Sequence, residues 1–448
     1  MWAYFSRGSS VASTLSSFVN HHSNITTMAA NDRLSNEYPK NGDLLQQHVK
    51  FPFSGLEANN PFLKAAMTER LATWDDNDHS KRGIPTPELI RAYEEWGKGG
   101  FGVILSGNTF GQFQYLEAKR NPIMAGNEPE RMEAFKKMAK AAKAHGSLYI
   151  VQLSHGGRQV PAEITAYPVA ASEARLTHMS GNDVTSKFGQ PNALDQEGIN
   201  TVIREFADAA KYAYDSGADG VQLHGAHGYL LSGFLSPSTN NRTDKYGGSL
   251  ENRSRIIMEI LDAVRAKVPD PKFLLGIKLN SVEFQQGGFG PEECKDVCTK
   301  LEEKSVDFIE LSGGSYESLA FQHRRESTVK RESFFLEWSD IVRQGVKKAQ
   351  IYVTGGFRTA KAMADALEAR SCVGIGLARP VCQEFDLPKQ ILEKKVASSR
   401  KSIIGEDNFL MANAVCCYQI KQVGEGHKPV DTLDKAALDP VLKELGLA

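Results

Sequence analysis

Residues 223–253 read LHGAHGYLLSGFLSPSTNNRTDKYGGSLENR and bring several chemically capable side chains close together in the chain. His224 and His227 lie three residues apart, and Tyr229 follows two residues later. Two neutral imidazole rings can donate hydrogen bonds to one developing oxyanion and so polarise a carbonyl group. A tyrosine hydroxyl, with its high pKa, can give a proton to a carbon centre. The spacing therefore predicts a site that activates a carbonyl compound.

Two other interpretations of this stretch stay open at the level of the residues. A metal site needs more ligands than two histidines, and the next carboxylate along the chain comes only at Asp244. Paired histidines also occur as buried, hydrogen-bonded residues of a protein core. The residues favour carbonyl chemistry over a metal site, and a purely structural pair remains the alternative.

The elements that must position these side chains follow a regular pattern. Past about residue 50, short apolar runs alternate with longer stretches of helical apolar spacing. Eight runs are predicted strands: 62–68, 100–107, 147–155, 220–225, 273–280, 307–314, 350–356 and 372–379. Eight continuous strands, each followed by a helix, indicate an α/β protein with a (β/α)8 TIM-barrel fold.

Most of the predicted strands end in a glycine or a polar residue: Thr68, Gly107, His155, His224, Asn280, Gly314 and Gly356. In a (β/α)8 barrel the carboxyl ends of the strands carry the active site. A single such residue is equally typical of a turn, but seven together favour a functional site at this end of the barrel.

The last two predicted strands carry the pattern of a phosphate site. TGGF (354–357) and GIGLARP (374–380) are glycine-rich strand ends that precede helices. The loops after these two strands often bind phosphate through backbone N–H groups. Arg379 would add a charge-assisted contact.

The ends of the chain are expected to lie outside the barrel. We expect one barrel domain over 49–400, a disordered or targeting extension over 1–48, and a helical tail over 401–448 packed on the barrel. The first 31 residues contain no Asp or Glu and are rich in Ser, which fits either a mitochondrial transit peptide or an unstructured extension. The predicted location is therefore the cytoplasm or, alternatively, the mitochondrion.

Composition narrows the set of partners. The formal net charge is −1 over 448 residues, which gives no electrostatic reason to expect nucleic acid or an anionic membrane surface. No apolar run is long enough to cross a bilayer. The six cysteines form no CxxC pair, so we interpret them as reduced thiols without a metal.

The motif that begins at His224 and ends at Arg253 resembles, almost without interruption, a conserved block of the Old Yellow Enzyme family, the FMN-dependent NAD(P)H:flavin oxidoreductases. NPFLKAAMTER (60–70) and VQLSHGGRQ (151–159) are also similar, and the resemblance spans about residues 50–400. The chain lacks the cysteine spacing of the iron–sulfur branches and is similar to the single-domain, NADH-oxidase-like branch.

The resemblance implies roles for individual residues. Three catalytic residues would act on the substrate, with His224 and His227 holding the carbonyl oxygen and Tyr229 protonating the carbon beside it. Lys278 stands where many relatives have Arg and would stabilise negative charge on the reduced ring. The other residues implied to bind FMN are Ala66, Met67, Thr68, Gly107 and Gln152 for the ring, and Gly314, Gly356, Ala378 and Arg379 for the phosphate.

The activity implied by the resemblance is a ping-pong reduction of activated alkenes or quinones, with NADH or NADPH as reductant. The expected binding partner is a small-molecule substrate, and the expected assembly is a homodimer. A flavin-binding sensor with little turnover is the alternative, and a flavin-free aldolase or isomerase barrel is a third hypothesis. The basic run HRRESTVKRES (323–333) is interpreted as a solvated loop, with contact to the nucleotide phosphates as the alternative.

Overall fold

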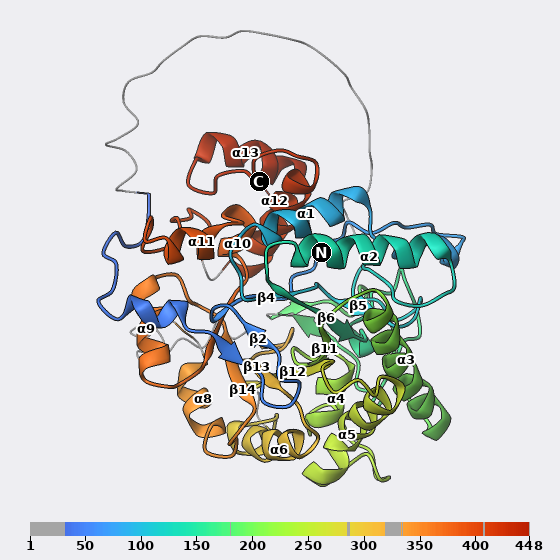
Figure 1. Ribbon diagram of the computed structural model, residues 1–448. Coiled ribbons are helices and arrows are strands. Elements are labelled where there is room, and N and C mark those ends of the chain that lie inside the picture. The colour runs from blue at the N-terminus through green and yellow to red at the C-terminus, as the bar shows by residue number, and fades with distance from the viewer. Residues whose placement is uncertain are drawn as a thin grey trace, which may run out of the picture.

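The computed structural model describes residues 32–179, 181–284, 287–318, 333, 335–405 and 408–447 (Figure 1). The interpretations of residues 1–31 and of the basic run 323–333, Ser333 excepted, lie outside the described residues. Within these ranges we find no helix that is both long enough and apolar enough to span a membrane.

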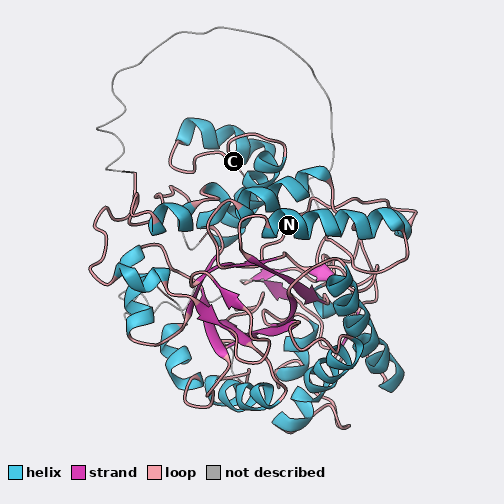
Figure 2. Ribbon diagram, in the orientation of Figure 1, coloured by secondary structure: helices cyan, strands magenta, loops and turns pink. Residues whose placement is uncertain are grey.

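Eight parallel strands close into a barrel, which is the ring of arrows in Figure 2. The ring closes because β11 pairs with β12 on one side and with β6 on the other. The barrel strands are β3 (Phe62–Lys64), β4 (Val103–Leu105), β6 (Leu148–Ser154), β11 (Gly220–Gly225), β12 (Leu274–Asn280), β13 (Phe308–Ser312), β14 (Gln350–Thr354) and β15 (Gly374–Leu377). All eight predicted strands and the (β/α)8 fold are confirmed.

The strands are buried on both faces, as a parallel sheet covered by helices requires. β12 reads LLGIKLN, and each of its seven residues is buried. The short hairpin of β1 (Val49–Lys50) and β2 (Glu57–Ala58) brings Phe51 against Phe308 and Tyr352. This aromatic contact fills the barrel interior at the amino ends of the strands, so the open end is the opposite one.

Helices surround the barrel and begin where their sequences provide caps. Thr86 and Ser249 accept hydrogen bonds from the first turns of the helices that they precede. Proline stands in the first turn of three of the outer helices. The outer helices include α1 (Pro87–Gly97), α2 (Pro129–Lys143), α3 (Gln196–Asp215), α5 (Leu250–Lys267), α6 (Pro291–Glu303), α8 (Leu336–Val342) and α9 (Ala360–Glu368).

Shorter elements lie in the connections. They are α4 (Leu230–Leu235), α10 (Pro380–Gln383), α11 (Leu387–Leu392), β5 (Thr109–Phe110) and two two-stranded sheets between β6 and α3. Those sheets pair β7 (Val169–Ala170) with β10 (Asn192–Ala193) and β8 (His178–Met179) with β9 (Asn182–Asp183).

The two ends of the chain pack on the barrel differently from each other. The 3-10 helix η1 (Gly42–Gln46) contacts α9, and Leu45 is fully buried in the main core. Part of the segment that the sequence suggested as an extension over 1–48 thus packs against the barrel, and the bounds of the domains stay a prediction. The tail forms α12 (Phe409–Gly424) and α13 (Lys435–Glu444), and α12 lies against α1 and α10 (Figure 1).

Candidate active site

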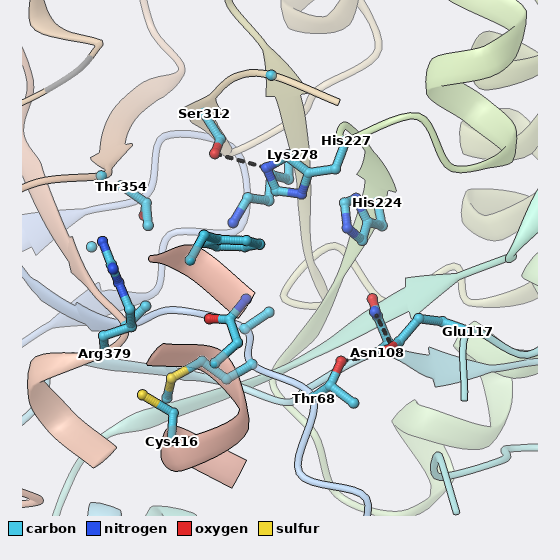
Figure 3. Close-up of a pocket in the computed structure, with 18 of the residues that line it drawn as sticks. Thr68, Asn108, Glu117, His224, His227, Lys278, Ser312, Thr354, Arg379 and Cys416 are labelled. Carbon is cyan, nitrogen blue, oxygen red and sulfur yellow. Dashed lines mark hydrogen bonds between the residues drawn. The ribbon is translucent and has the colours of Figure 1, made fainter. Parts of the chain in front are cut away.

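A cavity of about 320 Å³ lies at the carboxyl ends of the barrel strands (Figure 3). The structure brings together at its wall all but one of the residues to which the resemblance gave a role: Ala66, Met67, Thr68, Gln152, His224, His227, Tyr229, Lys278, Gly314, Gly356, Ala378 and Arg379. These residues come from seven different strand ends and their loops, so only the closed barrel makes them neighbours.

Gly107, which the resemblance implied to contact the FMN ring, does not line the cavity. Its N–H donates to Glu69 Oε1 at 3.0 Å and to the hydroxyl of Tyr93 at 2.9 Å, away from the cavity wall. A Cβ at this position would lie 2.2 Å from the carbonyl oxygen of Met67. Glycine is therefore required for close packing behind the wall, and the next residue, Asn108, lines the cavity instead.

His224 and His227 form a pair of neutral donors. Burial lowers the pKa of His224 well below its usual value and, together with the charge of Lys278, lowers the pKa of His227 to about 3. The Nδ1 atom of His224 accepts the N–H of Ala226 at 3.3 Å, so the ring proton of His224 is on Nε2. The centroids of the two rings are 5.2 Å apart, so both rings can donate to one oxygen acceptor.

An unusual backbone conformation places His227. This residue has a backbone φ of 62°, a conformation that residues other than glycine rarely adopt. Its N–H donates to Asn280 Oδ1 at 3.1 Å, and its Nε2 contacts the hydroxyl of Ser312 at 2.9 Å. Asn280 at the end of β12 thus holds the backbone of His227, and Ser312 at the end of β13 contacts its ring. The sequence analysis did not recognise either role.

Tyr229 is protonated and lies beside the histidines. Its ring packs edge-on against His224 at 4.8 Å, and its hydroxyl lies 2.9 Å from that of Tyr316. Burial raises the pKa of Tyr229 well above its usual value, and the neighbouring Tyr316 and Glu117 raise that pKa further. The hydroxyl therefore carries its proton at neutral pH.

Glu117 is a cavity carboxylate that the sequence interpretation missed. Its Oε2 accepts hydrogen bonds from Thr68 Oγ1 at 2.7 Å and Asn108 Nδ2 at 3.1 Å (Figure 3). Asn121 Nδ2 donates to the same oxygen at 3.3 Å. Arg70 lies 3.7 Å from Oε1. Glu117 lies in the irregular segment between β5 and α2, where no strand pattern distinguishes it from a surface carboxylate.

A second missed carboxylate, Glu310, organises the floor of the cavity. Glu310 is fully buried and accepts from Lys278 Nζ at 2.9 Å, Thr354 Oγ1 at 2.6 Å and Gln222 Nε2 at 2.8 Å. Gln152 in turn donates to Gln222 at 2.7 Å. Lys278 is therefore an ion-paired cation and not an isolated one. A charged residue inside the apolar run DFIELSGG was the signal that could have identified Glu310.

The loops after β13, β14 and β15 form the predicted phosphate end. Gly314, Gly355 and Gly356 have φ values of 83°, 139° and 98°, which only glycine adopts without strain. Arg379 follows at the start of α10. Glycine backbone beside an arginine suits a phosphate, and Gln152 with Lys278 offers polar contacts for a ring, so these residues fit FMN.

The tail forms an apolar part of the wall. α12 contributes Phe409, Leu410, Asn413, Cys416, Cys417 and Ile420 to the cavity. Leu410 also packs with Tyr316 on a cluster made of Leu176, Met179, Val184 and Phe188. The helix was predicted, but its place in the wall was not, because its sequence shows no preferred partner.

Comparison with known proteins places this arrangement in a wider group. Residues 56–397 match the family described as NADH:flavin oxidoreductase / NADH oxidase. The NADH-dependent flavin oxidoreductase nadA of Aspergillus parasiticus is 42% identical over 403 residues, which cover 89% of each chain. The probable flavin mononucleotide-dependent alkene reductase of Leishmania infantum is 31% identical over 277 residues, or 59% of this chain and 73% of that protein.

A solved structure supports the fold. The old yellow enzyme homologue from Zymomonas mobilis superposes with a TM-score of 0.65 at 24% identity, covering 79% of this chain and 94% of that one.

Proposed function

Because the chain belongs to the NADH:flavin oxidoreductase / NADH oxidase family, we propose that it reduces the activated carbon–carbon double bond of an α,β-unsaturated carbonyl compound. Family membership makes the protein an oxidoreductase that uses FMN and a nicotinamide nucleotide. The observation that carries the finer proposal is the meeting of His224, His227 and Tyr229 in one cavity with the residues that fit FMN.

The chain would hold FMN between three groups of contacts. The glycines after β13 and β14 and the guanidinium of Arg379 would bind the phosphate. Gln152, Lys278 and the backbone of residues 66–68 would contact the ring. When bound, FMN supplies the hydride that NAD(P)H delivers and that the β-carbon of the substrate receives.

His224 and His227 would hold the carbonyl oxygen of the substrate. Their rings are neutral, so each has one N–H to donate and no charge of its own. Negative charge that moves to the oxygen during reduction is stabilised by donors already in place in a site with little water. The cationic Lys278 lies close enough to lower the pKa of both rings, which adds a favourable field for an anionic oxygen.

Tyr229 would complete the reduction. Its O–H bond breaks, and the electron pair of the enolate forms a C–H bond at the α-carbon while the carbonyl is restored. The tyrosinate oxygen then takes a proton from water before the next turnover. We include a ping-pong order in the proposal because nucleotide and alkene would use the same cavity in turn.

The apolar wall supports an uncharged substrate of some size. Met179, Phe188, Phe409 and Leu410 line the cavity on the side of the tail. A cyclic or aromatic-substituted enone would bury its carbon skeleton there, while its carbonyl oxygen reaches the histidines.

The test uses the purified protein with its visible spectrum, first with NADH or NADPH and then with a cyclic enone, without oxygen. We expect a flavin spectrum that one nucleotide bleaches and the enone restores, with slower restoration in a Tyr229→Phe variant. A flavin that neither nucleotide bleaches would favour the sensor hypothesis. No flavin after reconstitution would refute the proposal.

Location and assembly remain predictions. All six cysteines are free in the structure, which supports a reducing compartment such as the cytoplasm or the mitochondrion. A homodimer would be detected by light scattering of the purified protein.

A further inference from the structure

We propose that Tyr316 is a proton relay, which stabilises the oxygen of Tyr229 after that residue has given up its proton and then returns a proton to it. This inference rests on the proposed function, in which Tyr229 protonates the substrate. It names the group through which Tyr229 receives its next proton. Tyr316 follows β13 in the chain and lines the same cavity as Tyr229.

The first observation is a direct contact between the two hydroxyl groups. The hydroxyl oxygens of Tyr316 and Tyr229 are 2.9 Å apart, and the two rings meet edge-on with centroids 6.0 Å apart. While both residues carry their protons, either hydroxyl can donate in this pair. Once Tyr229 has lost its proton, only the O–H of Tyr316 can supply the hydrogen bond. Tyr316 is therefore a donor to the anionic oxygen, whichever direction the bond has before the reaction.

The second observation is that the two tyrosines differ in their access to solvent. Tyr229 is 5% exposed, whereas Tyr316 is half-buried. Burial raises the pKa of Tyr229 well above its usual value, so its anion needs a hydrogen-bond donor from the protein. A transfer from Tyr316 to Tyr229 moves the need for a proton to the residue with more surface in contact with solvent.

The third observation is that contacts on both sides of Tyr316 hold it beside the histidine loop. Its neighbour Ser315 pairs with His227 in a parallel β-bridge. Its other neighbour, Glu317, accepts two hydrogen bonds from the guanidinium of Arg158, at 2.5 and 3.2 Å. The side chain of Arg158 is only 7% exposed, and paired charge-assisted bonds of this kind fix geometry well. The hydroxyl of Tyr316 is thus in place before a substrate binds.

The ring of Tyr316 has a packing role that its hydroxyl does not share. The ring lies 6.3 Å from that of Phe188 and packs on the same apolar cluster as Leu410. A phenylalanine at position 316 would keep this packing and remove only the hydroxyl. A functional loss in Tyr316→Phe would therefore report on the hydroxyl and not on the fold of the loop.

The proton moves in two steps. In the first step the O–H bond of Tyr229 breaks as the enolate electron pair forms the C–H bond at the α-carbon, and Tyr316 donates its hydrogen bond to the new tyrosinate. In the second step the O–H bond of Tyr316 breaks, and its proton forms a new O–H bond on Tyr229. Both groups are phenols of the same intrinsic acidity, so this transfer needs little driving force. Tyr316 then takes a proton from solvent, and both tyrosines end the cycle protonated.

The experiment separates the two half-reactions of the FMN-loaded enzyme by stopped flow. In Tyr316→Phe we expect bleaching by NAD(P)H to change less than about twofold and reoxidation by a cyclic enone to slow about 10- to 100-fold, as for the loss of one hydrogen bond to a charged oxygen. Tyr115→Phe is the matched control, because Tyr115 is also half-buried but stacks on His155 and does not line the cavity. The control should leave both half-reactions unchanged.

A double-mutant cycle tests whether the effect passes through Tyr229. If Tyr316 acts only on the oxygen of Tyr229, Tyr316→Phe should cause no further loss in a Tyr229→Phe background. A purely structural defect in the loop would instead slow both backgrounds by the same factor.

A spectroscopic readout does not depend on turnover. The Cζ resonance of Tyr229, identified in protein labelled with 13C-tyrosine by its loss in Tyr229→Phe, should shift in Tyr316→Phe and not in Tyr115→Phe. An unshifted resonance would show that the two hydroxyls are not hydrogen-bonded in solution, which would overturn the relay.

The kinetic results discriminate between the two proposals. If Tyr229→Phe itself leaves reoxidation unchanged, the proposed function fails and the relay fails with it. If Tyr229→Phe slows reoxidation but Tyr316→Phe does not, or if the two effects multiply in the double variant, the relay is refuted and the role of Tyr229 stands.

Discussion

Removal of both cavity histidines should weaken the binding of phenols that mimic the enolate of the substrate. The perturbation is the double variant His224→Ala, His227→Ala in the FMN-loaded enzyme. His224 is buried and His227 is half-buried, the pKa of each ring is lowered so that both are neutral, and the ring centroids lie 5.2 Å apart at the carboxyl end of one strand. A phenolate oxygen at this position would accept one N–H from each ring.

The magnitude follows from the strength of these two hydrogen bonds. A hydrogen bond to a charged partner contributes about 1.5–3 kcal/mol, and about 1.4 kcal/mol corresponds to a tenfold change in affinity. One ring should thus account for about 10- to 150-fold in Kd by that conversion. Because the rings share one acceptor, the double variant should lose less than the product of the two factors. We expect a loss of about 10²- to 10³-fold on this basis.

The assay is a titration with a para-substituted phenol, followed by the long-wavelength charge-transfer band of the flavin complex. His155→Gln is the control, because His155 follows β6 and is as buried as His224 but lines a small separate void beside Glu205. The control should bind phenol with an unchanged Kd. A double variant whose Kd rises less than threefold, while retaining FMN, would refute the oxygen-binding role of the histidines.

Three further predictions concern stability and access. Lys278→Met should lower the free energy of unfolding by about 3–5 kcal/mol, because it leaves the buried carboxylate of Glu310 without its cation; urea denaturation that shows a loss under 1 kcal/mol would contradict the importance of the pair. Burial lowers the folded-state pKa of His155 to about 3, so the stability that its neutral form contributes is complete above the unfolded-state value of 6.5 and is lost as pH falls toward 3. Below pH 6 the wild type should therefore lose about 1.4 kcal/mol more per pH unit than His155→Gln; parallel urea-derived stability profiles for the two proteins would argue against this. Cys416 lines the cavity, and the neighbouring thiol of Cys382 and then the charge of Arg379 lower the pKa of Cys416. N-ethylmaleimide should therefore label Cys416 in the FMN-free protein and much more slowly after FMN is added. Peptide mapping that finds equal labelling with and without FMN would show that Cys416 lies away from the cofactor.

The barrel and the central motif could be predicted from the sequence because their signals are local. Each strand is a short apolar run, and burial on both faces leaves little freedom in which residues can occupy it. His224, His227 and Tyr229 follow one such run directly, so the position of the strand also places them. The glycines after β13 and β14 were predictable for the same reason, since a strand end that approaches a ligand closely excludes a side chain.

The rest depended on contacts between distant parts of the chain. Glu117 accepts hydrogen bonds from Thr68 and Asn108 only when the segment after β5 folds back over the ends of β3 and β4. Glu310 changes Lys278 from an isolated cation to a paired one because neighbouring strands place the two side chains opposite each other. The sequence of the tail helix α12 does not specify which apolar surface the helix packs on. Its contacts with α1 and α10 place it at the wall of the cavity. Local patterns thus determined which residues reach the site, and tertiary packing determined their charges, their orientations and the wall that encloses them.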